Sequence, residues 1–438
     1  MKSYSVDLEQ MLAARDRRAD IQNRMLAGAG PGRCLVCLTM NIAGEIKRTP
    51  MIRMLFDAGV EKFKAQGFSI TEEYFLDEAS GCEAFWLLDE DGAGVKALME
   101  DIEDSFPAAR LFDFDVIMPD GVKLSRAAGR RCLICDAYAA ECARSRRHGL
   151  EEVKKATADL LKTFCAVRLA DAAHESLLDE LYTTPKPGLV DKNNNGAHSD
   201  MDAVLFERSA DALVPYFEDA ARLGMERCGI GLLRERGIKA EEEMFAATGG
   251  VNTHKGLVYS MGLLIAGMGR CLAEEGGSCI EQAAALARED AEERLRKALD
   301  APVTNGGAAY KAYGARGATG EAAAGFPHAV YCFEQLAFYR ESSCSGPASL
   351  ALCDSMASLE DTNLLHRGGR EGLEYVQHEA ERISGMPAEE RTDALHALDR
   401  ELIARGLSPG GSADMLALAF LLEHWRNISS DLFTEERE

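Results

Sequence analysis

The sequence predicts two domains, an α+β domain followed by an almost wholly α-helical one. Four stretches rich in β-forming residues lie within the first 118 residues, whereas no convincing period-2 alternation occurs after residue 150. Beyond that point Ala, Leu, Glu and Arg dominate, and Gly and Pro separate segments of helical length. With 438 residues, the chain is long enough to give each domain a core of its own.

The elements of the first domain follow from the spacing of its apolar residues. From Val6 to about Leu26 these residues recur at helical intervals with charges between them, which predicts an amphipathic opening helix. Helices are also expected at about residues 50–66 and 92–105. Strands are expected near residues 33–42, 68–76, 82–89 and 109–118.

The junction between the domains is predicted to lie within or beside a helix. The stretch from residue 150 to 182 has a continuous helical pattern, and no Gly or Pro interrupts it between Gly149 and Pro185. We therefore place the junction near residues 160–172, and we expect domains at residues 1–165 and 170–438.

Charge and composition exclude several classes of function. The formal net charge is −23, whereas nucleic acids and anionic membranes both favour basic surfaces, so neither is an expected partner. The 13 cysteines occur in a sequence that opens without an apolar signal-peptide core, which predicts reduced thiols and a cytoplasmic protein. The longest apolar run, from Leu257 to Met268, is too short to span a bilayer and is expected to be a buried helix.

A pair of carboxylates in the first domain has the spacing of a metal site. Asp113 and Asp115 alternate with Phe in a predicted strand, so both side chains point to the same face. Such a pair can hold Mg²⁺ between triphosphate oxygens, where the ion neutralises charge on leaving pyrophosphate. A solvent-facing strand with alternating Phe and Asp is the other interpretation. Lys47 is a candidate triphosphate ligand, although a solvated turn explains it nearly as well.

A basic segment follows this strand in an otherwise acidic protein. It contains the candidate substrate-binding residues Arg131, Arg144 and Arg146. Phosphates of a nucleotide or the acidic surface of a partner protein would both suit these arginines, and a solvated basic helix would also account for them.

The same segment contains three cysteines and a histidine. The spacing of Cys132, Cys135, Cys142 and His148 is compatible with zinc. Cys135 and Cys142 are also seven residues apart on one face of a predicted helix, where a buried thiol behaves as a small hydrophobe. We expect the second case, without a structural zinc ion.

The second domain carries six short polar segments in which Gly, Asn, Asp, His and Lys crowd together. Ordinary loops do not repeatedly place a charge beside glycines that let a ligand approach the backbone. Several such loops on one scaffold predict a site for a large polyanionic substrate that is bound through metal and cations. The six segments span residues 184–191, 196–202, 250–256, 313–321, 361–369 and 408–414.

These six segments, in this order, resemble the triphosphoribosyl-dephospho-CoA synthases from about residue 172 to about residue 430. The first domain is similar to the apo-citrate lyase phosphoribosyl-dephospho-CoA transferases, although Gly81-Cys-Glu83 departs from that family's pattern. This second resemblance rests on Arg15-Asp-Arg-Arg18 with Gln22 and on residues 41–47, 112–116, 131–135 and 142–148.

The resemblance implies a fusion of two consecutive enzymes of one pathway. The C-terminal domain would transfer triphosphoribosyl from ATP to 3′-dephospho-CoA and release adenine. The N-terminal domain, with a nucleotidyltransferase-like fold, would attach phosphoribosyl-dephospho-CoA to a serine of the citrate lyase acyl carrier (gamma) subunit and release pyrophosphate. Mg²⁺ is the expected cofactor, ATP and 3′-dephospho-CoA are the expected small-molecule substrates, and the acyl carrier is the expected protein partner.

The synthase reaction makes demands that its residues can meet. Cleavage of a ribose–nitrogen bond passes through an oxocarbenium-like state, so it needs an anion near the sugar, a base for the incoming hydroxyl and cations for the triphosphate. Expected metal ligands are Asp200, Asp361 and Asp414, with Asp191 a further carboxylate candidate. Expected catalytic residues are Glu321, as the base, and His198. Expected substrate ligands are Lys186, Asn252, His254, Lys255, Arg316 and Arg367.

Other interpretations stay open at this point. Asp200 and Asp414 could each cap a helix, and His198 and His254 could be loop histidines without a functional role. A metal-dependent nucleotide glycohydrolase, in which water replaces the acceptor hydroxyl, would use similar residues. A non-catalytic nucleotide-binding or carrier-binding module is the third alternative.

Overall fold

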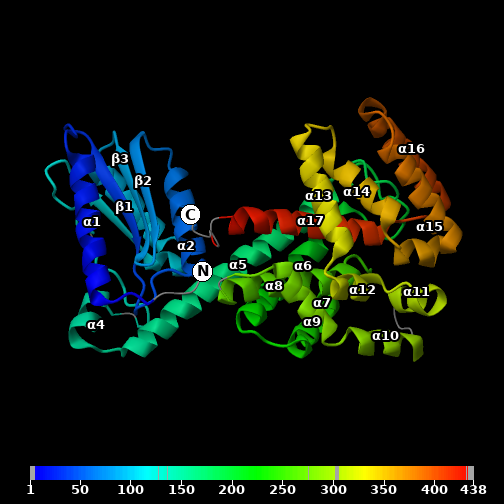
Figure 1. Cartoon of the computed structure of the whole chain (residues 1–438), viewed down its shortest axis with the longest axis horizontal. Helices are drawn as coiled ribbons and strands as arrows, with labels where there is room; N and C mark the ends of the chain where they lie inside the picture. Colours follow the sequence, from blue (N-terminus) through cyan, green and yellow to red (C-terminus); the bar gives the residue numbers. More distant parts are fainter. Residues whose placement is uncertain are drawn as a thin grey trace. The chain divides into compact units, whose positions relative to one another are not determined.

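The computed structural model describes residues 5–126, 128–135, 137–274, 276–300, 305–430 and 432. The chain divides into two compact units (Figure 1). Unit 1 comprises Met1–Cys165 together with Ser429–Glu438, and unit 2 comprises Ala166–Ile428.

Unit 1 contains a four-stranded antiparallel sheet with the strand order β2-β3-β1-β4. Its strands overlap the four stretches predicted from the sequence, so the α+β prediction for this part of the chain is confirmed. The last strand is shorter than expected because Pro107 begins a 3₁₀ turn, η1 (Pro107–Leu111), before the chain becomes extended. The strands are β1 (Cys34–Met40), β2 (Ile70–Glu78), β3 (Gly81–Leu88) and β4 (Phe112–Ile117).

Helices cover both faces of the sheet (Figure 1). α2 (Pro50–Lys64) and α3 (Gly92–Asp104) pack on one face, where the ring of Phe63 stacks on Trp86 with 3.9 Å between centroids. α1 (Leu8–Leu26) packs on the other face. Because successive strand residues point to opposite sides, the sheet separates two hydrophobic clusters.

On the outer edge of β4, side chains of α3 bind the backbone of Phe114, and the amide of Leu124 donates to the carbonyl of Val116 at 2.8 Å. Glu103 Oε1 accepts the amide N–H of Phe114 at 2.8 Å, and Lys96 Nζ donates to the carbonyl of Phe114 at 2.9 Å. Side chains that engage an edge strand prevent further strand pairing there. A cavity adjoins this edge.

Arg48 ties the end of the chain into unit 1. This residue is 6% exposed, and its guanidinium donates to both carboxylate oxygens of Asp77, at 2.9 and 3.0 Å. The third contact of this group is a 3.0 Å hydrogen bond from Nη1 to the carbonyl of the buried Leu432. Unit 1 is therefore completed by a residue far from the rest of it in sequence.

Helices are the only regular secondary structure among the described residues of unit 2, as the sequence predicts. α5 (Leu150–Tyr182) begins in unit 1 and continues into unit 2, since the division falls between residues 165 and 166. The helices that follow are α6 (Ala203–Met225), α7 (Ile230–Ala247), α8 (Lys255–Glu274), α9 (Cys279–Arg288), α10 (Ala291–Asp300), α11 (Asn305–Tyr313), α12 (Gly317–Ala324), α13 (Pro327–Glu341), α14 (Pro347–Ser358), α15 (Thr362–Ser384), α16 (Ala388–Arg405) and α17 (Gly410–Ser429).

α8 is the central apolar helix of unit 2, and Met261, Leu263 and Leu264 are fully buried in it. A Cβ on Gly224 of α6 would lie 2.2 Å from the carbonyl oxygen of Ala266, so glycine allows the two helices to pack closely. Among the described helices, α8 alone is long and apolar enough to cross a membrane, and 78% of its apolar window is buried inside the protein. Such burial is what a core helix shows, as the sequence predicts.

Candidate functional site

The carboxylate pair of unit 1 lies on the edge strand of the sheet. Asp113 and Asp115 share the α1-facing side of β4 with Ile117, whereas Phe112 and Phe114 enter the core on the opposite side. Both carboxylates are half-buried. The strand therefore sorts its aromatic and acidic residues onto opposite faces and leaves the two carboxylates accessible.

A cavity of about 430 Å³ adjoins this pair. Arg130 Nη2 lies 3.0 Å from Asp113 Oδ1, and Lys123 Nζ lies 2.5 Å from Asp115 Oδ1. Arg126 also lines the cavity. Carboxylate oxygens are suitable ligands for Mg²⁺, and the surrounding cations suit phosphate oxygens, so the residues present fit a metal–triphosphate group.

α1 contributes a third charged group beside the pair. Arg18 donates through Nε and Nη2 to the buried carboxylate of Glu83, at 3.0 and 2.5 Å. The hydrogen bond to Glu83 raises the pKa of Arg18, and the charge of Asp115 acts in the same direction. Gln22, from the same helix, contacts Cys37, which pairs with Asp115 across the ladder. Glu83 therefore positions Arg18 near the carboxylates.

The other basic residues predicted for this site lie outside the set that lines the cavity. Lys47 donates to the carbonyl of Ile42 at 2.5 Å, and burial lowers its pKa. The guanidinium of Arg131 lies over the ring of Tyr138, 4.8 Å from its centroid. The remaining two, Arg144 and Arg146, are exposed in and after α4 (Ala139–Ser145).

In unit 2 the six polar segments meet in space. The first two join through a 3.1 Å hydrogen bond from the amide of Ala197 to the carbonyl of Gly188. His198 Nε2 lies 2.9 Å from Ser408 Oγ, which links the second segment to the sixth. Arg367 brings in the fifth segment, since its Nη1 donates to the carbonyl of Ala197 at 3.1 Å.

Close backbone approaches join the other segments. A Cβ on Gly256 would lie 3.1 Å from Asp414 Oδ2, which places the third segment against the sixth. A Cβ on Gly317 would lie 3.2 Å from the side chain of Thr362, which places the fourth against the fifth. These glycines leave the space that the neighbouring groups occupy. Loops from distant parts of the sequence thus form one cluster.

A buried ion pair lies within this cluster. Lys186 is 2% exposed, and its Nζ lies 2.5 Å from Oε1 of Glu180, which is 6% exposed. Burial raises the pKa of Glu180, and the adjacent Lys186 opposes this shift. Taking two charges out of water carries a large desolvation cost, so a buried ion pair is weak evidence for added stability and marks a candidate functional position.

Asp361 joins the fifth and sixth segments. Its Oδ1 accepts the amides of Asn363 and Leu364 at 2.8 and 3.3 Å and so caps α15. Its Oδ2 accepts both the amide and the hydroxyl of Ser412, at 2.9 and 3.2 Å. Because a carboxylate offers about four lone-pair sites, these four donors account for its acceptor capacity.

Asp414 differs from Asp361 in its surroundings. Burial raises its pKa well above the ordinary value, and the charges of Asp361 and Glu180 add to this effect. The residue is nevertheless partly accessible. A carboxylate crowded by two others is stabilised by a nearby divalent cation, so Asp414 fits the role of a Mg²⁺ ligand.

The capping interpretations of Asp200 and Asp414 are wrong. α17 begins at Gly410, so Asp414 lies inside the helix, and the N-cap of α6 is Asp202, whose Oδ1 accepts the amide of Leu205 at 2.9 Å. Asp200 instead lies 3.8 Å from Nδ1 of His198 and is largely exposed.

Burial lowers the pKa of both histidines of the cluster. Burial lowers the pKa of His254 to about 3, and Nδ1 of this ring lies 2.7 Å from the hydroxyl of Ser209. A neutral His254 is unsuited to binding phosphate by charge. Burial also lowers the pKa of His198, and the adjacent Arg367, 3.1 Å from Nδ1, contributes.

The remaining predicted residues belong to the same six segments. Asp191 organises the first segment by accepting Thr184 Oγ1 at 2.6 Å and the amides of Asn193 and Asn194. Asn252 accepts the amide of Lys255 at 3.2 Å, and Lys255 Nζ lies 3.0 Å from Glu241. Arg316 contacts Glu292 at 2.8 Å. Glu321 accepts the amide of His328 at 2.7 Å and contacts its ring, which raises the pKa of His328.

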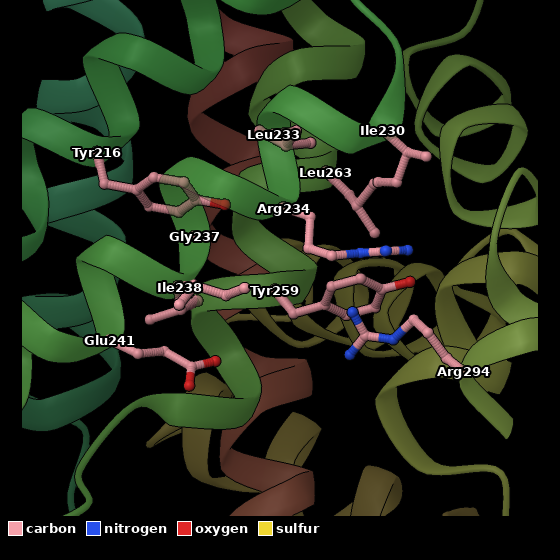
Figure 2. A pocket seen from close by; sticks show the side chains of 11 residues that line it. Tyr216, Ile230, Leu233, Arg234, Gly237, Ile238, Glu241, Tyr259, Leu263 and Arg294 are labelled. Carbon is pink, nitrogen blue, oxygen red and sulfur yellow. The ribbon is translucent and has the colours of Figure 1, made fainter. Parts of the chain in front are cut away.

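A small cavity in unit 2 is lined by residues outside the six polar segments, among them Glu241, which pairs with Lys255. Its volume is about 50 Å³, and Figure 2 shows Tyr216, Arg234, Tyr259 and Arg294 around it. The guanidinium of Arg294 lies over the Tyr259 ring, 4.2 Å from its centroid. Its lining includes none of the predicted site residues, so we place the site of unit 2 at the buried charges instead.

Sequence reasoning missed two carboxylates of the cluster. Glu180 occupies the same face of α5 as the buried residues Leu177 and Ala173, and a charge at such an apolar position was the available signal. Asp399 accepts the amide of Gly188 at 2.9 Å and the side chain of Asn194 at 2.9 Å. It lies within an ordinary helical pattern, so no local signal marked it.

Comparison with known proteins covers both parts of the chain. A family model described as ATP:dephospho-CoA triphosphoribosyl transferase (CitG) matches residues 166–431, and one described as apo-citrate lyase phosphoribosyl-dephospho-CoA transferase (CitX) matches residues 6–164. Protein CitXG of Haemophilus influenzae is 32% identical over 453 residues, which cover 96% of this chain and 97% of that protein.

Two synthases resemble the C-terminal part. The 2-(5''-triphosphoribosyl)-3'-dephosphocoenzyme-A synthase of Klebsiella pneumoniae is 38% identical over 279 residues, covering 60% of this chain and 92% of that protein. The enzyme of the same name from Haemophilus ducreyi is 35% identical over 315 residues, which cover 65% of this chain and 97% of that protein. The resemblance inferred from the sequence is thus confirmed, and the chain belongs to the CitX and CitG transferase families, joined in that order.

Proposed function

We propose that unit 2 makes the prosthetic-group precursor of citrate lyase and that unit 1 attaches it. In the first reaction triphosphoribosyl passes from ATP to 3′-dephospho-CoA and adenine leaves. In the second, phosphoribosyl-dephospho-CoA passes to a serine of the acyl carrier subunit and pyrophosphate leaves. The observation that carries this proposal is the match of both transferase families, in this order, across the chain.

In unit 2 the cluster of polar segments is the proposed site of triphosphoribosyl transfer. Asp414 supplies negative charge where an oxocarbenium-like ribose develops positive charge. Arg367 and Lys255 are proposed to bind the triphosphate, since each lies at the cluster and carries a cationic group. Asp361 and Asp191 act as positioning residues, because their oxygens already accept several backbone amides.

Mg²⁺ fits this site through Asp414, with Asp200 a further accessible carboxylate. The ion would screen the charge of the triphosphate, which stays on the ribose while adenine leaves. Glu321 is the proposed base for the incoming hydroxyl, and His328 holds its carboxylate in place. The ammonium group of Lys186 balances the negative charge of the buried Glu180 carboxylate.

In unit 1 the edge of β4 is the proposed site of carrier modification. Asp113 and Asp115 fit a Mg²⁺ ion, which would neutralise charge on pyrophosphate. Lys123, Arg130 and Arg126 line the cavity where the phosphates would lie. The exposed arginines after this strand, among them Arg131, Arg144 and Arg146, are proposed to meet the acidic surface of the acyl carrier in the cytoplasm.

The test is mass spectrometry of purified apo acyl carrier subunit after incubation with this protein, ATP, 3′-dephospho-CoA and Mg²⁺. We expect a gain of one phosphoribosyl-dephospho-CoA on the carrier and stoichiometric adenine. Omission of 3′-dephospho-CoA tests the alternative of a nucleotide glycohydrolase. Adenine release that continues at the same rate without this acceptor would contradict the proposed transfer.

A further inference from the structure

Four potential metal ligands converge in unit 1, away from the carboxylate pair. The donor atoms of Cys132, Cys135, Cys142 and His148 all lie within 4.8 Å of one another. The sulfurs of Cys135 and Cys142 are 3.5 Å apart, and Nε2 of His148 lies 3.3 Å from Cys135 Sγ. No other group of this kind occurs among the residues that the structure describes.

Local backbone structure produces this convergence. Arg131 and Tyr138 form an antiparallel bridge, and the amide of Cys132 donates to the carbonyl of Ala137 at 2.8 Å. The resulting tight hairpin carries the first two cysteines. α4 then supplies Cys142, and Arg146, with φ of 46°, ends this helix in a left-handed conformation. The chain thereby turns back before His148.

The sequence-based prediction for these cysteines is wrong in one respect. Cys135 and Cys142 do not share a helix face, because α4 begins only at Ala139, after the hairpin. Neither Cys132 nor Cys142 belongs to the two hydrophobic clusters that flank the sheet, although both are buried.

Two of the separations between ligand atoms fit a tetrahedral site. Zinc binds sulfur at about 2.3 Å and nitrogen at about 2.0–2.1 Å, so neighbouring ligand atoms in a tetrahedron are separated by roughly 3.5–3.8 Å. The two measured separations lie close to this range. The spacing is also typical of structural zinc sites. Two residues separate the first two cysteines, the third cysteine lies in a helix, and the histidine follows that helix.

We propose that Cys132, Cys135, Cys142 and His148 bind one structural Zn²⁺ ion. Three thiolates and one neutral imidazole would leave the site with a net charge of −1. Two donors already face the sulfurs, the amide of Ile134 at 3.4 Å from Cys132 Sγ and Nη1 of Arg147 at 3.9 Å from Cys135 Sγ. Such outer donors offset thiolate charge and hold ligands in place.

The zinc site fixes the basic segment against the proposed active site. Arg110 Nη2 donates to the carbonyls of Arg131 and Cys132, at 2.8 and 2.5 Å, and so connects the hairpin to η1. Directly before the hairpin, Arg130 contacts both Glu103, at 2.5 Å, and Asp113, at 3.0 Å. With four protein ligands the site is closed, so its role is structural and not catalytic.

The experiment uses the full chain, purified without an affinity tag, chelator or oxidant. Elemental analysis is expected to find about one zinc ion per chain, as a closed four-ligand site requires. Cys135→Ser and His148→Ala should each lose most of this zinc. Cys344→Ser is the matched control, since Cys344 is a partly accessible cysteine of unit 2 and should leave the zinc content unchanged.

A second measurement covers the case in which the ligand variants fail to fold. The wild-type chain refolded with Co²⁺ should show the d–d absorption of tetrahedral thiolate coordination, and added Zn²⁺ should abolish it. Wild-type protein that contains no zinc and shows no such cobalt spectrum would overturn the proposal. A Cys135–Cys142 disulfide in protein purified under reducing conditions would also overturn it. The same holds if both ligand variants retain their zinc.

Discussion

The acidic residues of the two units have different kinds of partner. In unit 1, Asp113 and Asp115 are half-buried on a strand edge, and each contacts a cationic side chain, Arg130 or Lys123. In unit 2, the carboxylate of Asp361 accepts backbone amides. Its neighbour Asp414 has a pKa that burial holds well above the ordinary value.

The difference concerns what must change when a substrate binds. Side-chain cations can move from a carboxylate to a phosphate, so the site of unit 1 can exchange an internal ion pair for a ligand at modest cost. Backbone amides are fixed, so unit 2 holds its charges before the substrate arrives, which reduces reorganisation during the reaction. The comparison therefore predicts that charge changes will have larger effects in unit 2.

The largest effect is expected from Asp414→Asn. The amide has nearly the same shape but cannot stabilise a metal or a developing cation, so adenine release should fall by at least about 100-fold. Initial rates of adenine release, measured by chromatography, check this. Asp393→Asn, on the exposed face of α16, is the control and should behave as wild type. A normal rate for Asp414→Asn would remove this residue from the mechanism.

Asp115→Asn is expected to slow carrier modification while adenine release continues. The substitution removes charge from the proposed Mg²⁺ pair, so attachment should slow by about 100-fold, and free triphosphoribosyl-dephospho-CoA should accumulate. Conversely, Asp414→Asn supplied with that intermediate should still modify the carrier. Loss of both activities in folded Asp115→Asn protein would show that the two sites are not independent.

Gly256→Ala should reduce adenine release by roughly tenfold, as expected for a small displacement of a reacting group. The added Cβ would lie 3.1 Å from Asp414 Oδ2 and displace this carboxylate. Gly231→Ala in α7 is the control, because nothing lies within 4 Å of its Cβ position. Equal activities of the two variants would argue against a close approach at Gly256.

The smallest effect is a change in stability with pH. The raised pKa of Asp414 means that the folded state binds this proton more tightly than the unfolded chain, whose Asp pKa is about 3.9. The stabilising contribution is present below that value and is lost as pH rises through the folded pKa.

Asn resembles the protonated acid, so Asp414→Asn should melt a few degrees above wild type at pH 8 without Mg²⁺, and this gap should narrow at lower pH. Added Mg²⁺ should raise the melting temperature of wild type more than that of the variant. A variant that melts below wild type at pH 8 would contradict the inferred charge burial.

Features set by short-range periodicity were accessible from the sequence. The alternation of Phe and Asp in β4 places Asp113 and Asp115 on one face whatever the rest of the fold does. The strands and the helical character of unit 2 follow for the same reason. Cys135 was assigned to the wrong element because the Arg131–Tyr138 bridge, a contact between non-adjacent residues, delays the start of α4.

Features set by tertiary contacts were not accessible. The polar segments of unit 2 were visible as compositional clusters, but nothing local indicates that Lys186 is buried against Glu180 or that Asp361 accepts both donors of Ser412. The same residue type can cap a helix, connect two loops or be a candidate ligand, and its tertiary neighbours decide which. Some of these neighbours are more than two hundred residues away in sequence, as Asp399 is from Gly188.

The hydrogen bond between Arg48 and Leu432 has a consequence for biosynthesis. Ribosomes release the N-terminal part of a chain first, and domains generally begin to fold as they emerge. Leu432 is translated only after all of unit 2. At a translation rate of about 5–20 residues per second, the hydrogen bond from Arg48 to Leu432 can form only on the order of tens of seconds after Arg48 is made. The first part of this protein to be made is thus among the last to be finished.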